Sequence, residues 1–241
     1  MKALVFAAGL GTRLRPLTDS MPKALVPVRG VPMLERVMRK LIAAGFGSFV
    51  VNAHHFSDMI VRFLEENSGF GADVSVSLEA GQPLETGGGI KKAAQLLGKG
   101  RFLVHNVDML TDLDVKWFVG QDVPGSLATL LLVEAEADRY LLFDEQMHLV
   151  GWTNVRTGEV KSPFPDFDPA RYRRYSFCGI HIVSDEVFAL MEEWPEKFSI
   201  IDFYLDACAG HIICGVVADN LKIIDIGSPQ KLAEAEASEL L

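Results

Sequence analysis

Two glycines, an arginine and a lysine near the start of the chain have the spacing of a phosphate-binding turn. Residues 2–8 are apolar after Lys2 and predict a buried strand, and Gly9 and Gly11 lie in the turn that follows it. Glycine allows a positive φ and a close backbone approach, so successive amide groups of such a turn can point at one anion. Arg13 and Lys23 add the positive charge that a polyphosphate requires. These residues therefore predict a site for a nucleotide's phosphates.

Two common phosphate motifs are excluded by the same residues. The dinucleotide-binding fingerprint needs a third glycine where Leu14 stands, and the P-loop needs a Gly-Lys-Ser/Thr run where Leu14-Arg15-Pro16 follows. An exposed turn between a strand and a helix would explain the glycines, but it leaves Arg13 and the Pro22-Lys23 pair without a purpose. The phosphate interpretation is therefore favoured over both motifs and over a plain turn.

A second glycine-rich block occupies residues 79–89, between a predicted strand and a predicted helix. Its three consecutive glycines, beginning at Gly87, would expose backbone amides at a helix N-terminus, where the helix dipole favours an anion. The same block is compatible with a flexible loop that Thr86 caps. We expect the first alternative, with the amides facing a ligand.

Two aspartates follow apolar segments that predict strands. Asp108 follows residues 101–106, and Asp225 lies in the run 222–226. Open α/β sheets bind ligands at the carboxyl ends of their strands, and a carboxylate there can hold magnesium, which prefers one or two carboxylates together with phosphate oxygens. Each aspartate taken singly is equally compatible with a cap or a turn.

Asp112 and Asp114 lie near Asp108 but do not have the EF-hand spacing. We expect both to cap the helix that follows them.

The order of four blocks along the chain resembles that of the sugar-1-phosphate nucleotidyltransferase family. The blocks are GLGTRLRPLT, PKALVPV, LETGGG and IDIG. The resemblance implies a Rossmann-like fold and the joining of a nucleoside triphosphate to a sugar 1-phosphate, with release of pyrophosphate. It also implies that Asp108 and Asp225 jointly bind Mg²⁺. Uridine is the favoured base, while guanosine and cytidine stay open, on other sugar phosphates or on phosphocholine.

The resemblance also implies which residues bind each substrate. It assigns catalysis to Arg13, which would hold the leaving pyrophosphate, and to Lys23, which would neutralise the α-phosphate region. The nucleotide-binding residues that it implies are Ala8, Gly9, Gly11, Thr12, Arg13, Lys23, Glu79, Thr86 and Gly87. Asn106 and Gly179 are implied for the sugar, although a turn and a core strand explain them as well. The family has glycine where Val107 stands, so an altered sugar pocket is expected.

Composition favours one domain and a small partner. The chain has 241 residues and a formal net charge of −9, which argues against a general nucleic-acid binder. The sequence has no signal-peptide pattern, and no apolar stretch approaches the ~20 residues that span a bilayer. Its three cysteines form no C-x-x-C pair, so reduced thiols are expected. We expect residues 1–241 to form one cytoplasmic nucleotidyltransferase domain without a nucleic-acid or membrane partner.

Strands and helices alternate through the first half, which predicts an α/β fold with a doubly wound, mostly parallel sheet. Expected strands are residues 2–8, 48–53, 73–79, 101–106, 127–133, 139–143, 175–183, 212–217 and 222–226. Expected helices are residues 32–44, 57–66, 88–97, 184–193, 199–209 and 228–240. Ser57 and Ser228 are the expected N-caps of two of them. Residues 158–169, with three prolines, predict an irregular excursion.

Three classes of function stay open on the sequence alone. The first is the nucleotidyltransferase, and the second is a non-catalytic sensor of a nucleotide or sugar phosphate on the same fold. The third is a dinucleotide-dependent oxidoreductase, which the missing third glycine disfavours. The presence of Arg13, Lys23, Asp108 and Asp225 together favours the enzyme.

Overall fold

The first half of the chain builds the parallel part of a mixed β-sheet. In the computed structural model, which describes residues 1–240, β1 (Lys2–Phe6) pairs in parallel with β4 (Ser48–Ala53) and with β6 (Phe102–Asn106). β5 (Asp73–Leu78) adds to the free side of β4, also in parallel. The carboxyl ends of these four strands therefore meet at one edge of the sheet, as the expected doubly wound fold requires.

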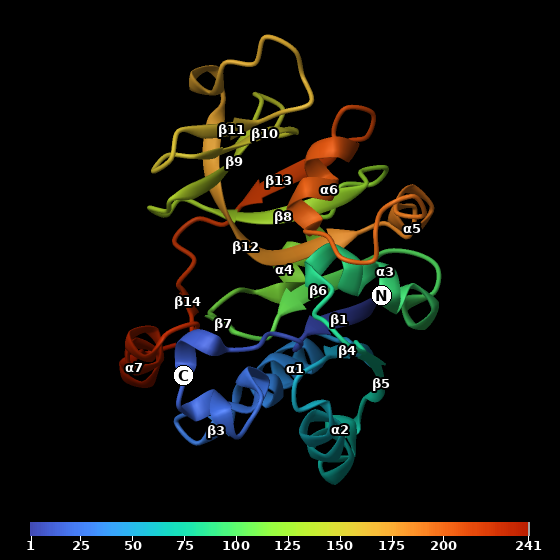
Figure 1. Ribbon diagram of the computed structural model, residues 1–241, viewed down its shortest axis with the longest axis vertical. Helices are drawn as coiled ribbons and strands as arrows, with labels where there is room; N and C mark the ends of the chain where they lie inside the picture. Colours follow the sequence, from blue (N-terminus) through green and yellow to red (C-terminus); the bar gives the residue numbers. More distant parts are fainter. Residues whose placement is uncertain (241) are drawn as a thin grey trace.

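The second half of the chain extends this sheet, mostly with antiparallel strands. The added strands are β8 (Ala128–Val133), β9 (Arg139–Phe143), β10 (Leu149–Asn154), β11 (Glu159–Lys161), β12 (Arg173–Val183) and β13 (Ile213–Val217). The long β12 pairs antiparallel with β6, β8 and β9. Beyond β9 the sheet continues with β10 and then β11, both antiparallel. β13 pairs in parallel with β8. Figure 1 shows β9, β10 and β11 at one end of the molecule and α2 at the other.

Helices cover both faces of the sheet because successive strand residues alternate between them. Leu4 of β1 packs in a core with α3 (Glu85–Leu97) and α6 (Ile200–Ala207). Its neighbours Ala3 and Val5 pack in a second core with α1 (Met33–Ala43) and α2 (Ser57–Glu66). The α/β fold predicted from the sequence is confirmed. Within residues 1–240, no helix has the length and apolarity needed to span a membrane.

The helix N-termini partly follow the expected caps. The Ser228 hydroxyl accepts from the Lys231 amide and caps α7 (Pro229–Ala237). Ser57 is not an N-cap, which corrects the expectation. The N-cap of α2 is Phe56, which has a φ of +54° and makes no side-chain cap, and Ser57 is the first helical residue.

The aspartates after β6 have separate roles. Asp114 caps α4 (Val115–Gly120) by accepting from the amides of Lys116 and Trp117. Asp112 instead accepts from the Lys222 amide at 2.9 Å, so the expected cap at Asp112 was wrong.

The second half differs from the expected elements in several places. β11 lies within residues 158–169, which were expected to be irregular. The sequence did not predict β10, because Gly151 and the neighbouring polar residues interrupt its apolar pattern. The helix expected over residues 184–193 is reduced to α5 (Val187–Leu190).

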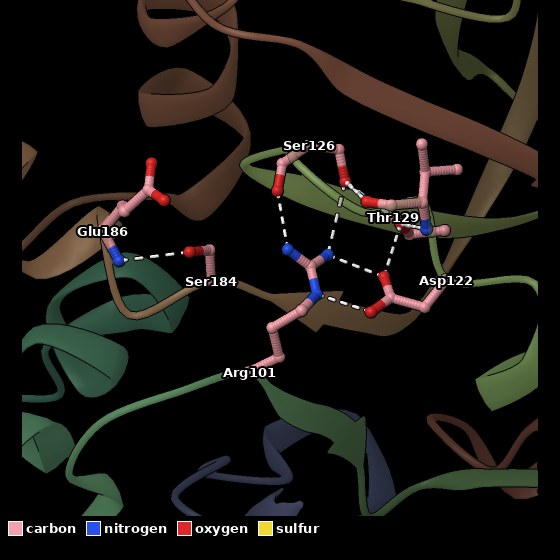
Figure 2. Close-up of polar contacts among 7 residues, drawn as sticks. Arg101, Asp122, Ser126, Thr129, Ser184 and Glu186 are labelled. Carbon is pink, nitrogen blue, oxygen red and sulfur yellow. Dashed lines mark hydrogen bonds and ion pairs between the residues drawn. The ribbon is translucent and has the colours of Figure 1, made fainter.

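A partly buried polar network fixes the connection between α4 and β8. The guanidinium of Arg101 binds both carboxylate oxygens of Asp122, at 2.5 and 2.6 Å, and donates to the Ser126 carbonyl at 2.6 Å. The Thr129 hydroxyl donates to the same carboxylate at 2.8 Å (Figure 2). Paired and hydrogen-bonded in this way, the charges are stably accommodated below the surface.

Candidate active site

The loop after β1 carries the glycines predicted to bind phosphate. Gly11 has a φ of +63°, and a Cβ on it would lie 2.8 Å from Thr18 Cγ2. The Thr18 hydroxyl donates to the Gly11 carbonyl at 2.7 Å. Gly9 has no atom within 4 Å of its Cβ position, so the backbone there faces open space. Gly11 therefore shapes the turn, and Gly9 leaves room for close approach by a ligand.

This loop forms one wall of a cavity of about 440 Å³ at the carboxyl edge of the parallel strands. The other walls come from the ends of β4, β5 and β6. Residues expected to bind the nucleotide line this cavity, namely Ala8, Gly9, Gly11, Thr12, Arg13, Lys23, Glu79 and Thr86. Gly87 does not line it. We call this the first cavity.

Lys23 joins the two aspartates that were expected to hold a metal. Its ammonium contacts Asp108 Oδ2 and lies 3.5 Å from Asp225 Oδ1, and its side chain is only 9% exposed. Arg13 Nη2 lies 3.9 Å from the other oxygen of Asp225. Two carboxylates and two cations from distant parts of the chain therefore meet at one side of the first cavity.

A small two-stranded sheet carries Asp225 to this position. β14 (Ile223–Asp225) pairs antiparallel with β7 (Met109–Thr111), and the Ile226 amide donates to the Asp108 carbonyl at 3.0 Å. Gly227 follows, and a Cβ on it would lie 2.5 Å from Arg13 Nη2. Gly227 also lines the first cavity. Gly227 ends the IDIG block of the sequence, but nothing in that block indicates that the glycine makes room for the guanidinium.

The oxygen donors at this point suit a hard divalent cation. Asp225 Oδ1 is buried and accepts no hydrogen bond from residues 1–240, although the ammonium of Lys23 is nearby. Across the same residues, no three or more Asp, Glu, His or Cys side chains gather in a way that could hold a metal. Two carboxylates completed by phosphate oxygens and water are the environment that Mg²⁺ prefers. The residues present therefore fit a magnesium ion that arrives with a polyphosphate.

Glu79 lies in the wall of the first cavity with both carboxylate oxygens occupied. Asn52 Nδ2 donates to one oxygen at 2.7 Å, and the Leu84 amide donates to the other at 2.8 Å. Glu79 therefore holds the following loop in place. Asn52 also lines the cavity, and sequence reasoning missed it. The signal was available, because Asn52 is a polar residue at the end of an apolar strand.

The three consecutive glycines of the second block lie inside α3 and not in front of it. The amides of Gly87 and Gly88 both donate to the Phe198 carbonyl, at 3.0 and 3.2 Å. A Cβ on Gly87 would lie 2.4 Å from the Phe198 ring, and one on Gly88 would lie 2.1 Å from the Glu196 carbonyl. These glycines allow a neighbouring segment to pack closely on α3. The expectation that the amides of Gly87 and Gly88 face a ligand was therefore wrong.

A second cavity, of about 280 Å³, adjoins the first and shares Thr86, Asn106 and Asp108 with it. Gly179 lines this second cavity, where the pairing of β12 with β8 is irregular. Its φ is +73°, and a Cβ on it would lie 2.1 Å from Asn106 Nδ2. The two residues expected on the sugar side are therefore neighbours in the structure.

Thr86 and Val107 each have a clear packing role. The Thr86 hydroxyl oxygen accepts from the Ile200 amide at 3.1 Å and does not cap α3. Val107 is 4% exposed and is not among the residues with positive φ, and its amide donates to the Phe6 carbonyl at 3.1 Å. Val107 therefore occupies its place without needing the conformational freedom of glycine.

Burial keeps three titratable side chains of β6 and β12 uncharged. It lowers the pKa of His181 to about 3 and raises the pKa of Cys178 to about 12, and both residues line the second cavity. His105, on β6, also has a pKa lowered to about 4 by burial. At neutral pH these histidines are not proton carriers, and the thiol is protonated.

Comparisons with known proteins identify the family of this chain. The model of the nucleotidyl transferase family matches residues 2–138. The N-acetylmuramate alpha-1-phosphate uridylyltransferase of Caulobacter vibrioides is 32% identical over 241 residues, which cover 98% of this chain and 95% of the relative. The protein of the same name from Neisseria meningitidis serogroup B is 44% identical over 114 residues, 47% of this chain and 49% of the relative.

A solved structure extends the similarity to the whole fold. The crystal structure of HddC from Yersinia pseudotuberculosis superposes with a TM-score of 0.76 at 26% identity and covers 97% of both chains. This chain therefore belongs to the nucleotidyl transferase family. The family resemblance inferred from the four sequence blocks is confirmed.

Proposed function

We propose that this enzyme transfers uridine monophosphate from UTP to a sugar 1-phosphate, with N-acetylmuramate 1-phosphate as the leading acceptor. The products are a nucleotide sugar and pyrophosphate. The observation that carries the proposal is the meeting of Arg13, Lys23, Asp108 and Asp225 beside two adjoining cavities. Uridine and the muramyl sugar are supported by the similarity to the Caulobacter relative over nearly the whole chain.

The reaction needs charge stabilisation more than proton transfer. The phosphate oxygen of the acceptor is already anionic, so it attacks the α-phosphorus in line while pyrophosphate leaves from the opposite side. Positioning and electrostatic stabilisation then supply most of the catalysis. The lowered pKa values make His105 and His181 weak bases, which is consistent with a reaction that has no general base.

The proposed roles divide between the two cavities. Ala8, Gly9, Gly11 and Thr12 surround the triphosphate, Arg13 holds the leaving pyrophosphate, and Lys23 neutralises charge near the α-phosphate. Glu79 and Thr86 lie on the nucleoside side, and Gly87 acts through the packing of α3. Asn106 and Gly179 contact the sugar. The cavity walls described above support this division.

Asp108 and Asp225 are the residues that would hold magnesium. When bound, Mg²⁺ would offset phosphate charge and help orient the two anionic substrates. Lys23 contacts one of these carboxylates and lies near the other, so it keeps their repulsion low before a metal binds.

A substrate matrix tests the proposal. Pyrophosphate release is measured with Mg²⁺, each of four nucleoside triphosphates, and a panel of acceptors that includes N-acetylmuramate 1-phosphate and phosphocholine. Release that needs UTP and one sugar 1-phosphate together is the expected result. Pyrophosphate release only with GTP or only with CTP would mean that the enzyme transfers a guanosine or cytidine nucleotide instead of uridine monophosphate. Triphosphate binding without release in any pairing would favour the non-catalytic sensor.

We also propose that residues 1–241 act as one domain in the cytoplasm. The main sheet draws strands from both halves of the chain, which supports a single unit. Its three cysteines are free and buried, which is consistent with a reducing compartment.

A further inference from the structure

A third cavity continues the sugar side of the site toward the antiparallel extension of the sheet. It has a volume of about 510 Å³ and shares Phe177 and Ile201 with the second cavity. It also shares Glu85 with the first cavity. A ligand seated between Asp108 and Gly179 could therefore extend a substituent into this third cavity.

The carboxylates of the third cavity are already paired. Lys161 Nζ lies 3.2 Å from Asp202 Oδ1 and 3.8 Å from Glu159 Oε1. Glu85 Oε1 lies 3.9 Å from Lys197 Nζ. Lysines therefore offset part of the negative charge of the walls, through half-exposed pairs that each contribute little to stability.

Arg139 is the contrasting side chain. It is exposed and lines the third cavity, and within residues 1–240 it forms no ion pair. The carboxylate next to it in sequence, Asp138, pairs with Arg156 at 3.4 Å. Arg174 on the neighbouring strand lies over the Tyr140 ring at 5.0 Å and lines a different cavity. Arg139 is therefore the arginine available to an anion that enters the third cavity.

We infer that Arg139 binds a carboxylate on the acceptor sugar and so determines specificity for acidic sugar 1-phosphates. The lactyl ether of N-acetylmuramate carries such a carboxylate, and N-acetylglucosamine 1-phosphate lacks it. A guanidinium fork matches a carboxylate in bidentate geometry, and Trp152 and Leu141 supply apolar wall next to it. This inference rests on the proposed function and names the residue that separates two otherwise similar acceptors.

The test compares Arg139→Gln with the wild-type enzyme on these two acceptors. The expected result is a fall of about tenfold or more in kcat/KM for N-acetylmuramate 1-phosphate, carried mainly by KM, because a hydrogen-bonded charge is lost far from the reacting phosphorus. The kcat/KM for N-acetylglucosamine 1-phosphate stays within about twofold of wild type. Arg139→Lys keeps the charge and recovers part of the selectivity.

Arg174→Gln is the matched control, because it removes the same charge from the adjacent strand outside the third cavity. It is expected to leave the selectivity ratio unchanged. An equal loss on both acceptors in Arg139→Gln, or no change in the ratio, would overturn the inference. So would an equal shift in the ratio for Arg174→Gln, because it would indicate a general field effect.

Calorimetric binding separates this inference from the proposed function. N-acetylmuramate 1-phosphate is titrated into wild type and Arg139→Gln without UTP. If wild type shows no transfer in any pairing but binds this sugar phosphate in an Arg139-dependent manner, the proposed function fails and the inference stands. Equal binding by wild type and Arg139→Gln, or no binding by either, overturns the inference.

Discussion

The Asn106 side chain fills the space that any side chain on Gly179 would need, since a Cβ on that glycine would lie 2.1 Å from Asn106 Nδ2. Asn106 ends the parallel strand β6, and Gly179 lies in the antiparallel strand β12. The proposed sugar side of the site therefore depends on a close contact between the two kinds of strand.

Gly179→Ala is expected to impair use of the sugar. The added methyl displaces Asn106, and we expect kcat/KM for the acceptor to fall by about 10- to 100-fold, as a misplacement near 1 Å can produce. The KM for the nucleoside triphosphate stays near wild type. Gly158→Ala is the control, because Gly158 has a similar φ of +76° and no atom within 4 Å of its Cβ position. Equal effects of both variants would mean that backbone strain, and not the contact with Asn106, causes the loss of activity.

Arg13→Ala is expected to lower kcat by about 100-fold, the scale observed when one preorganised electrostatic group is removed. Arg15→Ala provides the comparison from the same loop. The Arg15 side chain pairs with Asp19 at 3.2 Å and does not line the first cavity. Steady-state pyrophosphate release measures both, and near-normal turnover in Arg13→Ala would remove this residue from the proposed mechanism.

Asp225→Asn is expected to raise the magnesium concentration needed for half-maximal activity. The amide keeps the size of the side chain but loses the charge that attracts a divalent cation. Asp219→Asn, at an exposed position, removes an equal charge from a nearby segment and leaves the titration unchanged. A magnesium titration that is the same for wild type and Asp225→Asn would exclude Asp225 as a ligand.

Arg101→Ala is expected to destabilise the fold by about 2–4 kcal/mol, because it leaves the largely buried Asp122 carboxylate without its partner. Arg39→Ala is the control. Its pair with Glu35 at 2.7 Å is mostly exposed on the arginine side, so the expected loss is about 0–1 kcal/mol. Urea unfolding measures both, and similar losses would mean that the network shown in Figure 2 adds no special stability.

Stability is expected to fall as the pH drops from about 6.5 toward 4. The folded chain keeps His105 and His181 neutral, with pKa values lowered to about 4 and 3, while the unfolded chain titrates them near 6.5. The unfolded state therefore binds more protons in this window, and the free energy of unfolding rises with pH. His181→Gln should flatten this slope, whereas His211→Gln, at an exposed position, should not. Chemical unfolding at several pH values measures the free energy of unfolding. Equal pH slopes for wild type and His181→Gln would contradict the expectation.

The first half of the fold could be predicted because its signals are local. Apolar runs end in glycine, and one face of α1 carries apolar residues at helical spacing, namely Leu34, Met38 and Leu41. The carboxyl edge of the sheet then follows from parallel pairing alone. Many residues that the family resemblance implied for the nucleotide follow strands at this edge, and most of them line the first cavity.

The missed features depend on contacts between distant segments. Gly87 and Gly88 look like part of a ligand-binding loop in the sequence, but their amides donate to the Phe198 carbonyl. Nothing local to Gly227 indicates that Arg13 lies against it. The lysine between the two aspartates could not be foreseen either, because three separate loops have to meet to place it there.

The pairing of β14 with β7 also sets the order in which a newly made chain becomes competent. A ribosome-bound chain that has not yet released residues 222–226 can form the glycine loop and present Asp108, yet it has no second carboxylate to place beside Lys23. Of the charged residues at the site, Asp225 is the last to be synthesised. Under the proposed role of Asp225 in metal binding, a nascent chain therefore becomes active only after β14 has docked on β7.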